Sequence, residues 1–323
     1  MTENVVFYHS ADNDGRCSGA IARIALESKG GVEIFGMDYG DDPDEIADLD
    51  GVKVWFIDVT PDVEWLRTRG EAIFKKCGAV AVIDHHVSFA EKVCKKLDGP
   101  EFELKGEFFW LEFHYDDALA ACELAWSVLM KTQPPWNVRL LGVYDTWARD
   151  STMWQAALEF QYGMRAHDTE AGNDWLWDRV FRGGEHFERE TRKAGRAIIG
   201  YKSQCAATDT ANRVEEFVLH PGACGDAEPL KVVAFHGLKS TANSSTFEHV
   251  FDENRHQAML HVHADPSGKA VFSLYSPAQC AEVKDLAVSY GGGGHAHAAG
   301  FTVAGVDKYP LWRALNTSPV EEK

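Results

Sequence analysis

Short apolar runs alternate with longer amphipathic stretches through the first half of the chain. Val5–Tyr8, Val54–Ile57 and Ala79–Ile83 are continuous apolar segments, which predicts buried strands. Helical patterns follow each of them, at about Gly15–Glu27, about Val63–Lys76 and near Phe89–Leu97. Apolar strands that alternate with helices predict an α/β fold with a doubly wound, mainly parallel sheet covered on both faces.

The pattern changes in the second half of the chain. It is mostly helical from about Ala118 to Arg182, and a polar stretch at about Glu185–Gln204 then predicts a connector helix. Strands are expected at Val214–Leu219, Lys231–Phe235, Ala258–Val262 and Ala270–Tyr275, with a helix at Ala281–Ser289. We therefore predict an N-terminal domain with helical additions over residues 1–184, a connector over 185–207 and a smaller C-terminal α/β domain over 208–323.

Charge and cysteine usage narrow the functional classes. The chain has 323 residues and a formal net charge of -18, so a long polyanion is a poor partner and a nucleic-acid substrate should be short. Its 7 cysteines are odd in number and lack a C-x-x-C pair, which argues against a disulfide framework or a zinc cluster. No segment is apolar for long enough to cross a bilayer, and we expect a cytoplasmic protein without a membrane partner.

Two further features have ordinary structural interpretations. Trp147, Trp154, Trp175 and Trp177 are expected to pack in the core or at an interface rather than to stack on bases. Arg189, Arg192 and Arg196 share one helical face, which is interpreted as a solvated face. The alternative is a positive rim that guides phosphates.

Acidic and imidazole residues follow each predicted N-terminal strand. The first strand is followed by His9, Asp12 and Asp14, the second by Asp58, and the third by Asp84, His85 and His86. The carboxyl ends of parallel strands meet at one edge of a sheet, so these side chains should lie together. Buried without cations they would repel one another, and divalent metal is the natural remedy. Oxygen and imidazole ligands without thiolate favour Mn²⁺, with Mg²⁺ or Co²⁺ as substitutes.

These segments resemble the motifs of a known family. His9-x-x-Asp12-x-Asp14-Gly15, Asp58, Asp84-His85-His86 and Asp145 look like the successive motifs of the DHH phosphoesterase superfamily. Gly292-Gly293-Gly294-His295-x-x-Ala298-Ala299-Gly300 looks like the signature of the C-terminal domain associated with it. The resemblance runs from near the N-terminus to about residue 303. Each motif is short, and their order and spacing make the set specific.

The resemblance implies a role for each residue. One ion would be held by His9, Asp12 and Asp58, and a second by Asp14, Asp58, His85 and Asp145, with Asp58 bridging. His86 would face the substrate phosphate, and Asp84 would orient an imidazole. Asp145 is assigned only by its place after the other motifs, because alone it would pass for a carboxylate on a helix face. Such a pair of ions activates a water for in-line attack on phosphorus.

The glycine motif has a physical logic of its own. Gly292, Gly293 and Gly294 leave one backbone stretch without side chains, so peptide N–H groups can approach an anion closely. His295 adds a donor that can be charged. A glycine-rich turn alone is usually only a turn. Joined to the metal motifs, it is expected to hold a terminal phosphate or nucleotide.

One position departs from the family pattern. Members often carry an arginine between two serines in the preceding strand, where this chain has Tyr275. Tyrosine cannot supply a bidentate contact to phosphate. The missing charge would have to come from Arg255, Lys239 or the Arg189–Arg196 face, and substrate preference should differ accordingly.

The leading hypothesis is a metal-dependent phosphodiesterase, similar to nano-RNases, that hydrolyses short single-stranded oligonucleotides to nucleoside monophosphates. The alternatives are a phosphatase or phosphodiesterase acting on 3'-phosphoadenosine nucleotides or on linear dinucleotides derived from cyclic messengers, and a pyrophosphatase or exopolyphosphatase. A binding module that has lost catalysis should lack some of the ligands, and here the set is intact. Polarity of degradation, RNA or DNA preference and a homodimeric state are left open by the sequence.

Overall fold

The computed structural model describes most of the chain. The described residues are 2–86, 90, 108, 110–210, 213–223, 227–237, 244–265, 268–277, 279–304 and 310–320. They divide into two compact units, Met1–Ile199 and Gly200–Lys323. The helix expected near Phe89–Leu97 and the side chain of Lys239 lie outside the described residues. In the part of the chain that is described, no helix combines the length and the apolar character needed to span a membrane.

A five-stranded parallel sheet forms the centre of the first unit. Its strand order is β2-β1-β3-β4-β5. The strands are β1 (Thr2–His9), β2 (Gly31–Met37), β3 (Lys53–Ile57), β4 (Val80–Asp84) and β5 (Glu112–Tyr115). The three predicted apolar strands are confirmed as β1, β3 and β4, which occupy the middle of the sheet. The edge strands β2 and β5 were not predicted.

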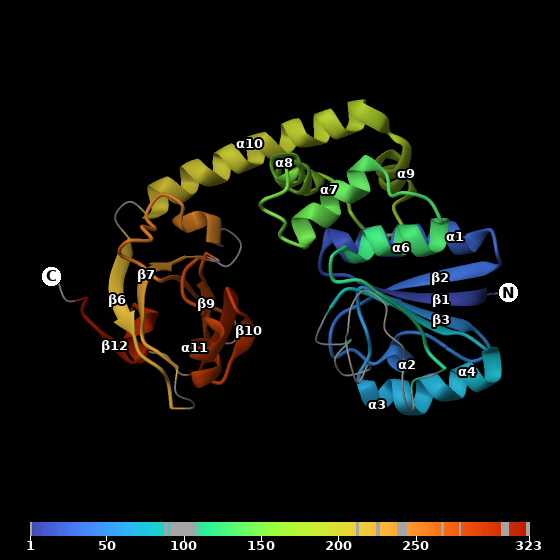
Figure 1. The fold of residues 1–323 in the computed structure, drawn as a ribbon, viewed down its shortest axis with the longest axis horizontal. Coiled ribbons are helices and arrows are strands. Elements are labelled where there is room, and N and C mark those ends of the chain that lie inside the picture. The colour runs from blue at the N-terminus through green and yellow to red at the C-terminus, as the bar shows by residue number, and fades with distance from the viewer. Residues whose placement is uncertain are drawn as a thin grey trace. The chain divides into compact units, whose positions relative to one another are not determined.

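Helices cover both faces of this sheet (Figure 1). α1 (Asn13–Glu27), α6 (Ala121–Met130) and α7 (Trp136–Asp145) lie on one side, and α2 (Pro43–Ile46), α3 (Val63–Trp65), η1 (Leu66–Gly70) and α4 (Glu71–Cys77) lie on the other. Successive side chains of β1 alternate between the two cores, because strand residues point to opposite faces in turn. Val6 packs in the α1 core and Phe7 in the η1 core. The predicted doubly wound α/β architecture is confirmed.

Helices dominate the chain between β5 and the second unit, as predicted. After α6 and α7 come α8 (Trp154–Met164), α9 (Asp174–Arg182) and the long α10 (Gly184–Thr210), within which the two units divide. Trp177 is fully buried, as expected, whereas Trp147 and Trp175 are about half exposed, at 48% and 55%. Trp147 and Trp175 are therefore not core residues, and the interface packing that was the other part of the expectation stays a prediction for them.

A seven-stranded mixed sheet forms the second unit, with strand order β10-β11-β9-β8-β7-β6-β12. The strands are β6 (Val214–Leu219), β7 (Leu230–His236), β8 (Ala258–Ala264), β9 (Ala270–Tyr275), β10 (Gly293–His295), β11 (Ala298–Val303) and β12 (Thr317–Ser318). α11 (Lys284–Ser289), η3 (Ser244–Phe247) and η4 (Leu311–Ala314) complete this unit as the structure describes it. The four predicted strands are confirmed, and the predicted helix begins three residues later than expected.

Candidate metal centre

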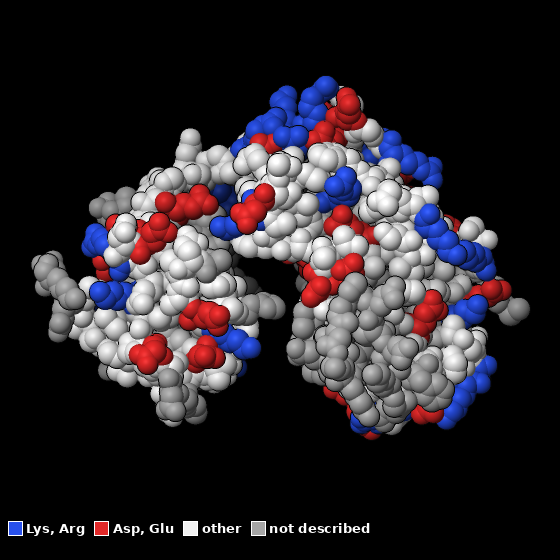
Figure 2. Space-filling view, in the orientation of Figure 1, with Lys and Arg blue, Asp and Glu red and all other residues white. Residues whose placement is uncertain are grey.

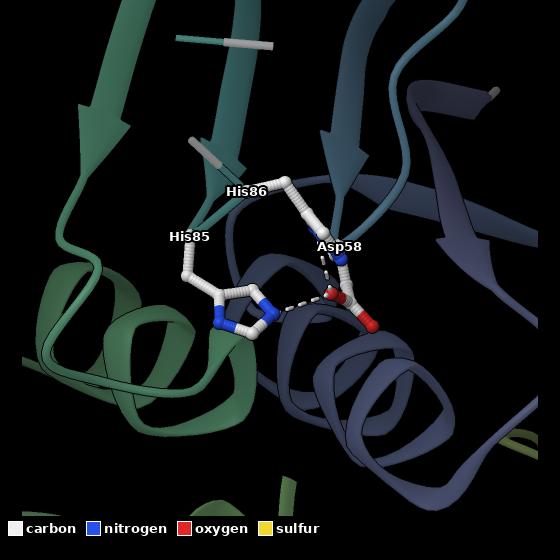
Figure 3. Close-up of side chains that lie close together, drawn as sticks. All are labelled: Asp58, His85 and His86. Carbon is white, nitrogen blue, oxygen red and sulfur yellow. Dashed lines mark ion pairs between the residues drawn. The ribbon is translucent and has the colours of Figure 1, made fainter. Parts of the chain in front are cut away.

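The carboxyl ends of β1, β3 and β4 bring the predicted ligands together. Asp58 and His85 directly follow β3 and β4, and His85 Nε2 and His86 Nδ1 both approach Oδ1 of Asp58, at 3.3 and 3.8 Å (Figure 3). Three groups have ligand atoms that all lie within 4.8 Å of one another. The groups are His9 with Asp12 and Asp58, Asp14 with His85 and Asp145, and Asp58 with His85 and His86.

The first group gathers around the imidazole of His9. Its Nδ1 lies 3.2 Å from Asp12 Oδ2 and 3.6 Å from Asp58 Oδ2. Asp12 is also the N-cap of α1, where its Oδ1 accepts a hydrogen bond from the Gly15 N–H at 2.9 Å. Capping holds the carboxylate in place with one oxygen and leaves the other directed at the cluster.

The second group gathers around His85. Its Nε2 lies 3.3 Å from Asp58 Oδ1 and 3.5 Å from Asp145 Oδ2, and Asp145 is the last residue of α7. Asp14 is buried, and its two oxygens accept hydrogen bonds from the backbone N–H groups of Ala121 and Cys122, both at 2.9 Å. Those groups belong to the first turn of α6, whose free N–H groups favour a carboxylate.

Asp84 and His86 form a separate pair beside this cluster. Asp84 is buried, and its Oδ1 accepts hydrogen bonds from the backbone N–H groups of His85 and His86 at 2.7 and 3.0 Å. The same oxygen lies 2.8 Å from Nδ1 of His86. This arrangement fixes the His86 ring, and the side chain remains about one third exposed at 34%.

Two backbone features make this close packing possible. Asp58 has a left-handed backbone with φ of 62°, which is uncommon for a residue other than glycine and is concentrated at functional sites. At Gly15 a Cβ atom would lie 2.1 Å from the carbonyl oxygen of His9, so only glycine allows α1 to start so close to β1. Both features bring carboxylates toward the same point.

The protonation behaviour of the cluster reflects its excess negative charge. Burial and the charge of Asp58 raise the pKa of Asp145 to about 7, and burial raises the pKa of Asp14 as well. Hydrogen bonds to Asp12 and Asp58 raise the pKa of His9 to about 10. Burial opposes ionisation of His85, but its interaction with Asp58 dominates together with the neighbouring carboxylates and raises that pKa to about 9.

The donor set fits divalent cations. It consists of carboxylate oxygens and imidazole nitrogens, the ligands that suit manganese and magnesium better than thiolate-seeking ions. Oδ1 of Asp58 is buried and has no well-aligned hydrogen-bond donor among the described residues, although a buried charged oxygen normally has such a partner. Cations at these groups would satisfy that oxygen and offset the repulsion among the carboxylates.

The raised pKa values predict how metal binding depends on pH. Ligand nitrogens and oxygens must lose their protons to coordinate, so protons on His9, His85 and Asp145 would compete with an ion held by these residues. We expect the affinity for Mn²⁺ to rise between about pH 6 and about pH 8, by up to about tenfold per pH unit for each proton displaced. Calorimetry in buffers of different ionisation enthalpy would measure the protons released. An affinity that is independent of pH, without proton release, would contradict this assignment.

Two residues near the cluster were missed from the sequence. Asp38 Oδ1 lies 3.4 Å from His9 Nε2, and the Tyr39 hydroxyl lies 3.4 Å from both ring nitrogens of His86. Burial raises the pKa of Tyr39, which keeps the hydroxyl protonated as a donor. Both residues follow β2, which lies beside β1 in the sheet. Residues at the carboxyl ends of parallel strands share one edge of the sheet, which is how the other candidate residues were predicted. The same argument would have predicted Asp38 and Tyr39 if β2 had been recognised as a strand.

The glycine motif lies in the second unit, on the edge strand β10 and the turn before it. A Cβ at Gly292 would lie 2.1 Å from the carbonyl oxygen of Gly300, and Gly294 has a φ of 139°. These two glycines are therefore required by the pairing with β11. Gly293 is exposed with open space around it. The backbone of His295 ends β10, and its side chain lies outside the described part.

Lys239 apart, which is not described, the cations considered as substitutes for the absent arginine already contact carboxylates. Arg192 Nε and Arg196 Nη1 lie 2.9 and 2.8 Å from Oε2 of Glu159, a buried residue of α8. Arg189 and Arg196 are exposed, as the solvated-face interpretation expects, but Arg192 and Arg196 also hold α10 against α8 through this carboxylate. Basic and acidic side chains are accordingly mixed over the surface of α9 and α10 (Figure 2). In the second unit, Arg255 pairs with Glu216 at 2.8 Å.

Comparisons with known proteins identify the type of fold. No family model matches the sequence, and no curated protein matches it. Among solved structures, the DHH domain of a protein described as a member of a family of ribosomal proteins is 13% identical, with a TM-score of 0.52, covering 97% of this chain and 85% of that one. The chain has the fold of a DHH-domain protein.

Two further solved structures align over similar lengths. The exonuclease RecJ bound to manganese is 13% identical, with a TM-score of 0.46, and the alignment covers 97% of this chain and 87% of the RecJ chain. An exopolyphosphatase-related protein from Bacteroides fragilis is 11% identical, covers 97% and 89%, and has a TM-score of 0.47. At such identities and TM-scores these two likenesses carry no argument, and an activity has to be argued from the side chains of this chain.

Proposed function

We propose that this chain is a phosphodiesterase that hydrolyses short single-stranded oligonucleotides to nucleoside monophosphates. It uses two divalent cations for this reaction, and Mn²⁺ is the preferred one. The observation that carries the proposal is the meeting of two ligand groups at Asp58, one containing His9 and Asp12 and the other His85. A carboxylate shared by two groups is what a pair of neighbouring ions requires. Asp14 and Asp145, which lie with His85, would complete the ligands of the second ion.

Bound cations would supply a water of lowered pKa as the nucleophile and positive charge for the phosphoryl oxygens. His86 would add a donor on the open side of the cluster. Burial lowers the pKa of His86, but its hydrogen bond to Asp84 outweighs burial and raises it, so the ring tends to be protonated. A protonated imidazole, held in one orientation by Asp84 and Tyr39, would stabilise negative charge on a phosphoryl oxygen during attack.

Two features support a short substrate. The net charge of -18 weakens the attraction for a long polyanion, whose binding depends on many cationic contacts. In the second unit, β10 is an edge strand, and such a strand presents backbone N–H groups that no neighbouring strand satisfies. The Gly292 N–H already donates to the Ala287 carbonyl at 3.0 Å, so we propose that Gly293 and Gly294 use such groups to bind a phosphate or nucleotide.

A substrate panel tests this function. The full chain, supplied with Mn²⁺, is incubated with 5'-labelled oligonucleotides of graded length, a 3'-phosphoadenosine nucleotide and inorganic polyphosphate. We expect release of nucleoside monophosphates from the shortest oligonucleotides, loss of this activity with a chelator, and rates that fall as the oligonucleotide lengthens.

Other outcomes would separate the alternatives. If phosphate were released only from polyphosphate, or only from the phosphoadenosine nucleotide, that compound and not an oligonucleotide would be the substrate. The proposed metal chemistry would still hold. No hydrolysis of any phosphoester by the metal-supplied chain would contradict the proposed function as a whole.

A further inference from the structure

Trp147 has a strained backbone immediately beyond the metal cluster. Its φ is 54°, a left-handed conformation that is a genuine outlier for a bulky side chain and costs about 1–2 kcal/mol. The turn is held by hydrogen bonds from the Trp147 N–H to the Tyr144 carbonyl at 3.2 Å and from the Arg149 N–H to the Trp147 carbonyl at 2.7 Å. Such strain persists mainly at active sites and ligand clamps, so this tryptophan calls for a functional reason.

The surroundings of Trp147 hold its ring in a fixed plane, cover part of it and leave about half of the side chain exposed. The ring meets Trp154 edge to face, with centroids 5.1 Å apart, and meets Tyr144 in the same way at 5.7 Å. The guanidinium of Arg149 lies 4.6 Å from its centroid. Even so, 48% of the side chain is exposed. An indole that is fixed in orientation and open to solvent is a suitable platform for stacking another flat ring.

Arg149 is available to bind an anion. It is exposed, and within the described residues it forms no ion pair with a carboxylate. Most other arginines of the unit are paired, as Arg16 is with Glu170 and Arg23 with Asp174.

The platform lies close to the proposed chemistry. Trp147 is two residues beyond Asp145, which ends α7 and contacts His85. Since consecutive Cα atoms are about 3.8 Å apart, the Cα atoms of Trp147 and Asp145 lie within roughly 7 Å of each other. A nucleotide whose phosphate is at the cluster could therefore reach the indole with its base.

We propose that Trp147 and Arg149 form a nucleotide-binding subsite beside the metal cluster. The indole stacks on a nucleobase, and the guanidinium contacts an anionic or carbonyl oxygen of the same nucleotide. This inference rests on the proposed function and deepens it, because it makes the substrate a base-bearing phosphoester rather than inorganic polyphosphate.

A second tryptophan–arginine pair provides a matched control. Trp175 on α9 is 55% exposed, and Arg179 lies 4.0 Å from its ring centroid. This pair has the same composition as the first, but its tryptophan lies in a regular helix and follows none of the ligand-bearing segments. Trp175→Ala therefore removes an equally exposed indole without touching the proposed subsite.

The test measures equilibrium binding rather than turnover. The Mn²⁺-supplied full chain is dialysed against radiolabelled AMP and, separately, against ribose 5-phosphate, which has the same phosphate and sugar without the base. We expect wild type to bind AMP more tightly. Trp147→Gly should weaken AMP binding about 5- to 150-fold, the loss that corresponds to one base–aromatic stack, and leave ribose 5-phosphate binding unchanged. Trp147→Phe should retain much of the preference, and Trp175→Ala all of it.

Glycine is chosen because it adopts a positive φ without strain, so the variant should remain folded, as thermal unfolding would show. The subsite is refuted if Trp147→Gly binds AMP as tightly as wild type, or if wild type does not distinguish AMP from ribose 5-phosphate. These results differ from a failure of the proposed function, which would appear as the absence of phosphoester hydrolysis by wild type.

Discussion

Asp58→Asn is expected to reduce phosphodiester hydrolysis on the order of 10³-fold, because this one carboxylate serves both ligand groups. It contacts His9 through one oxygen and His85 through the other. Asparagine keeps the size of the side chain and tolerates a left-handed backbone, so the φ of 62° should persist. The loss should therefore come from chemistry and not from unfolding. Initial rates with a dinucleotide, together with the Mn²⁺ affinity, would measure it.

Asp178→Asn is the matched control for the change of charge. Asp178 is an exposed residue of α9 whose contact with Arg182, at 3.4 Å, is of the kind that contributes little. This variant should keep wild-type rates and metal affinity. If Asp58→Asn also kept them, the bridging role of Asp58 would be wrong.

Gly15→Ala should damage both stability and metal binding. Alanine favours a helix over glycine by up to about 1 kcal/mol. Here, however, the new Cβ would lie 2.1 Å from the His9 carbonyl oxygen and 2.6 Å from the His9 Cβ. A backbone oxygen cannot rotate away, so α1 and β1 must separate, which costs about 1–3 kcal/mol or more. We expect a lower free energy of unfolding and weaker Mn²⁺ binding, because His9 and Asp14 move with these two elements.

Gly172→Ala provides the comparison. A Cβ at Gly172 would meet no atom within 4 Å, and its backbone has no positive φ. Its stability should change by less than about 0.5 kcal/mol. Denaturant unfolding of both variants decides the point, since an unchanged midpoint for Gly15→Ala would mean that the approach of α1 to β1 is not tight.

The core of the site was predictable because strand ends in a parallel sheet share an edge. His9 ends β1, and Asp58 and His85 directly follow β3 and β4. The continuous apolar sequences of these strands mark them as central, and the meeting of the three residues follows from topology alone. The edge strand β2 escaped notice because glycine interrupts it and most of its residues are partly exposed. Asp38 and Tyr39, which follow β2, were missed with it.

Other features could not be predicted because they depend on tertiary packing. The three arginines of α10 share a helical face in the sequence, but only the fold reveals the buried Glu159 that Arg192 and Arg196 contact. Similarly, tryptophan side chains are on average largely buried in proteins, so burial is the expectation from residue type alone. The exposure of Trp147 follows from a left-handed turn after α7 that no local pattern announces, since glycine or asparagine is the usual residue at such a position.

Anomalous diffraction from crystals of the full chain grown with Mn²⁺ would show whether two cations bind at this cluster. We expect two neighbouring anomalous peaks, one at His9, Asp12 and Asp58 and the other at Asp14, His85 and Asp145, with Asp58 between them. A metal-supplied crystal with no anomalous peak at these side chains, or with manganese only elsewhere on the protein, would contradict this expectation.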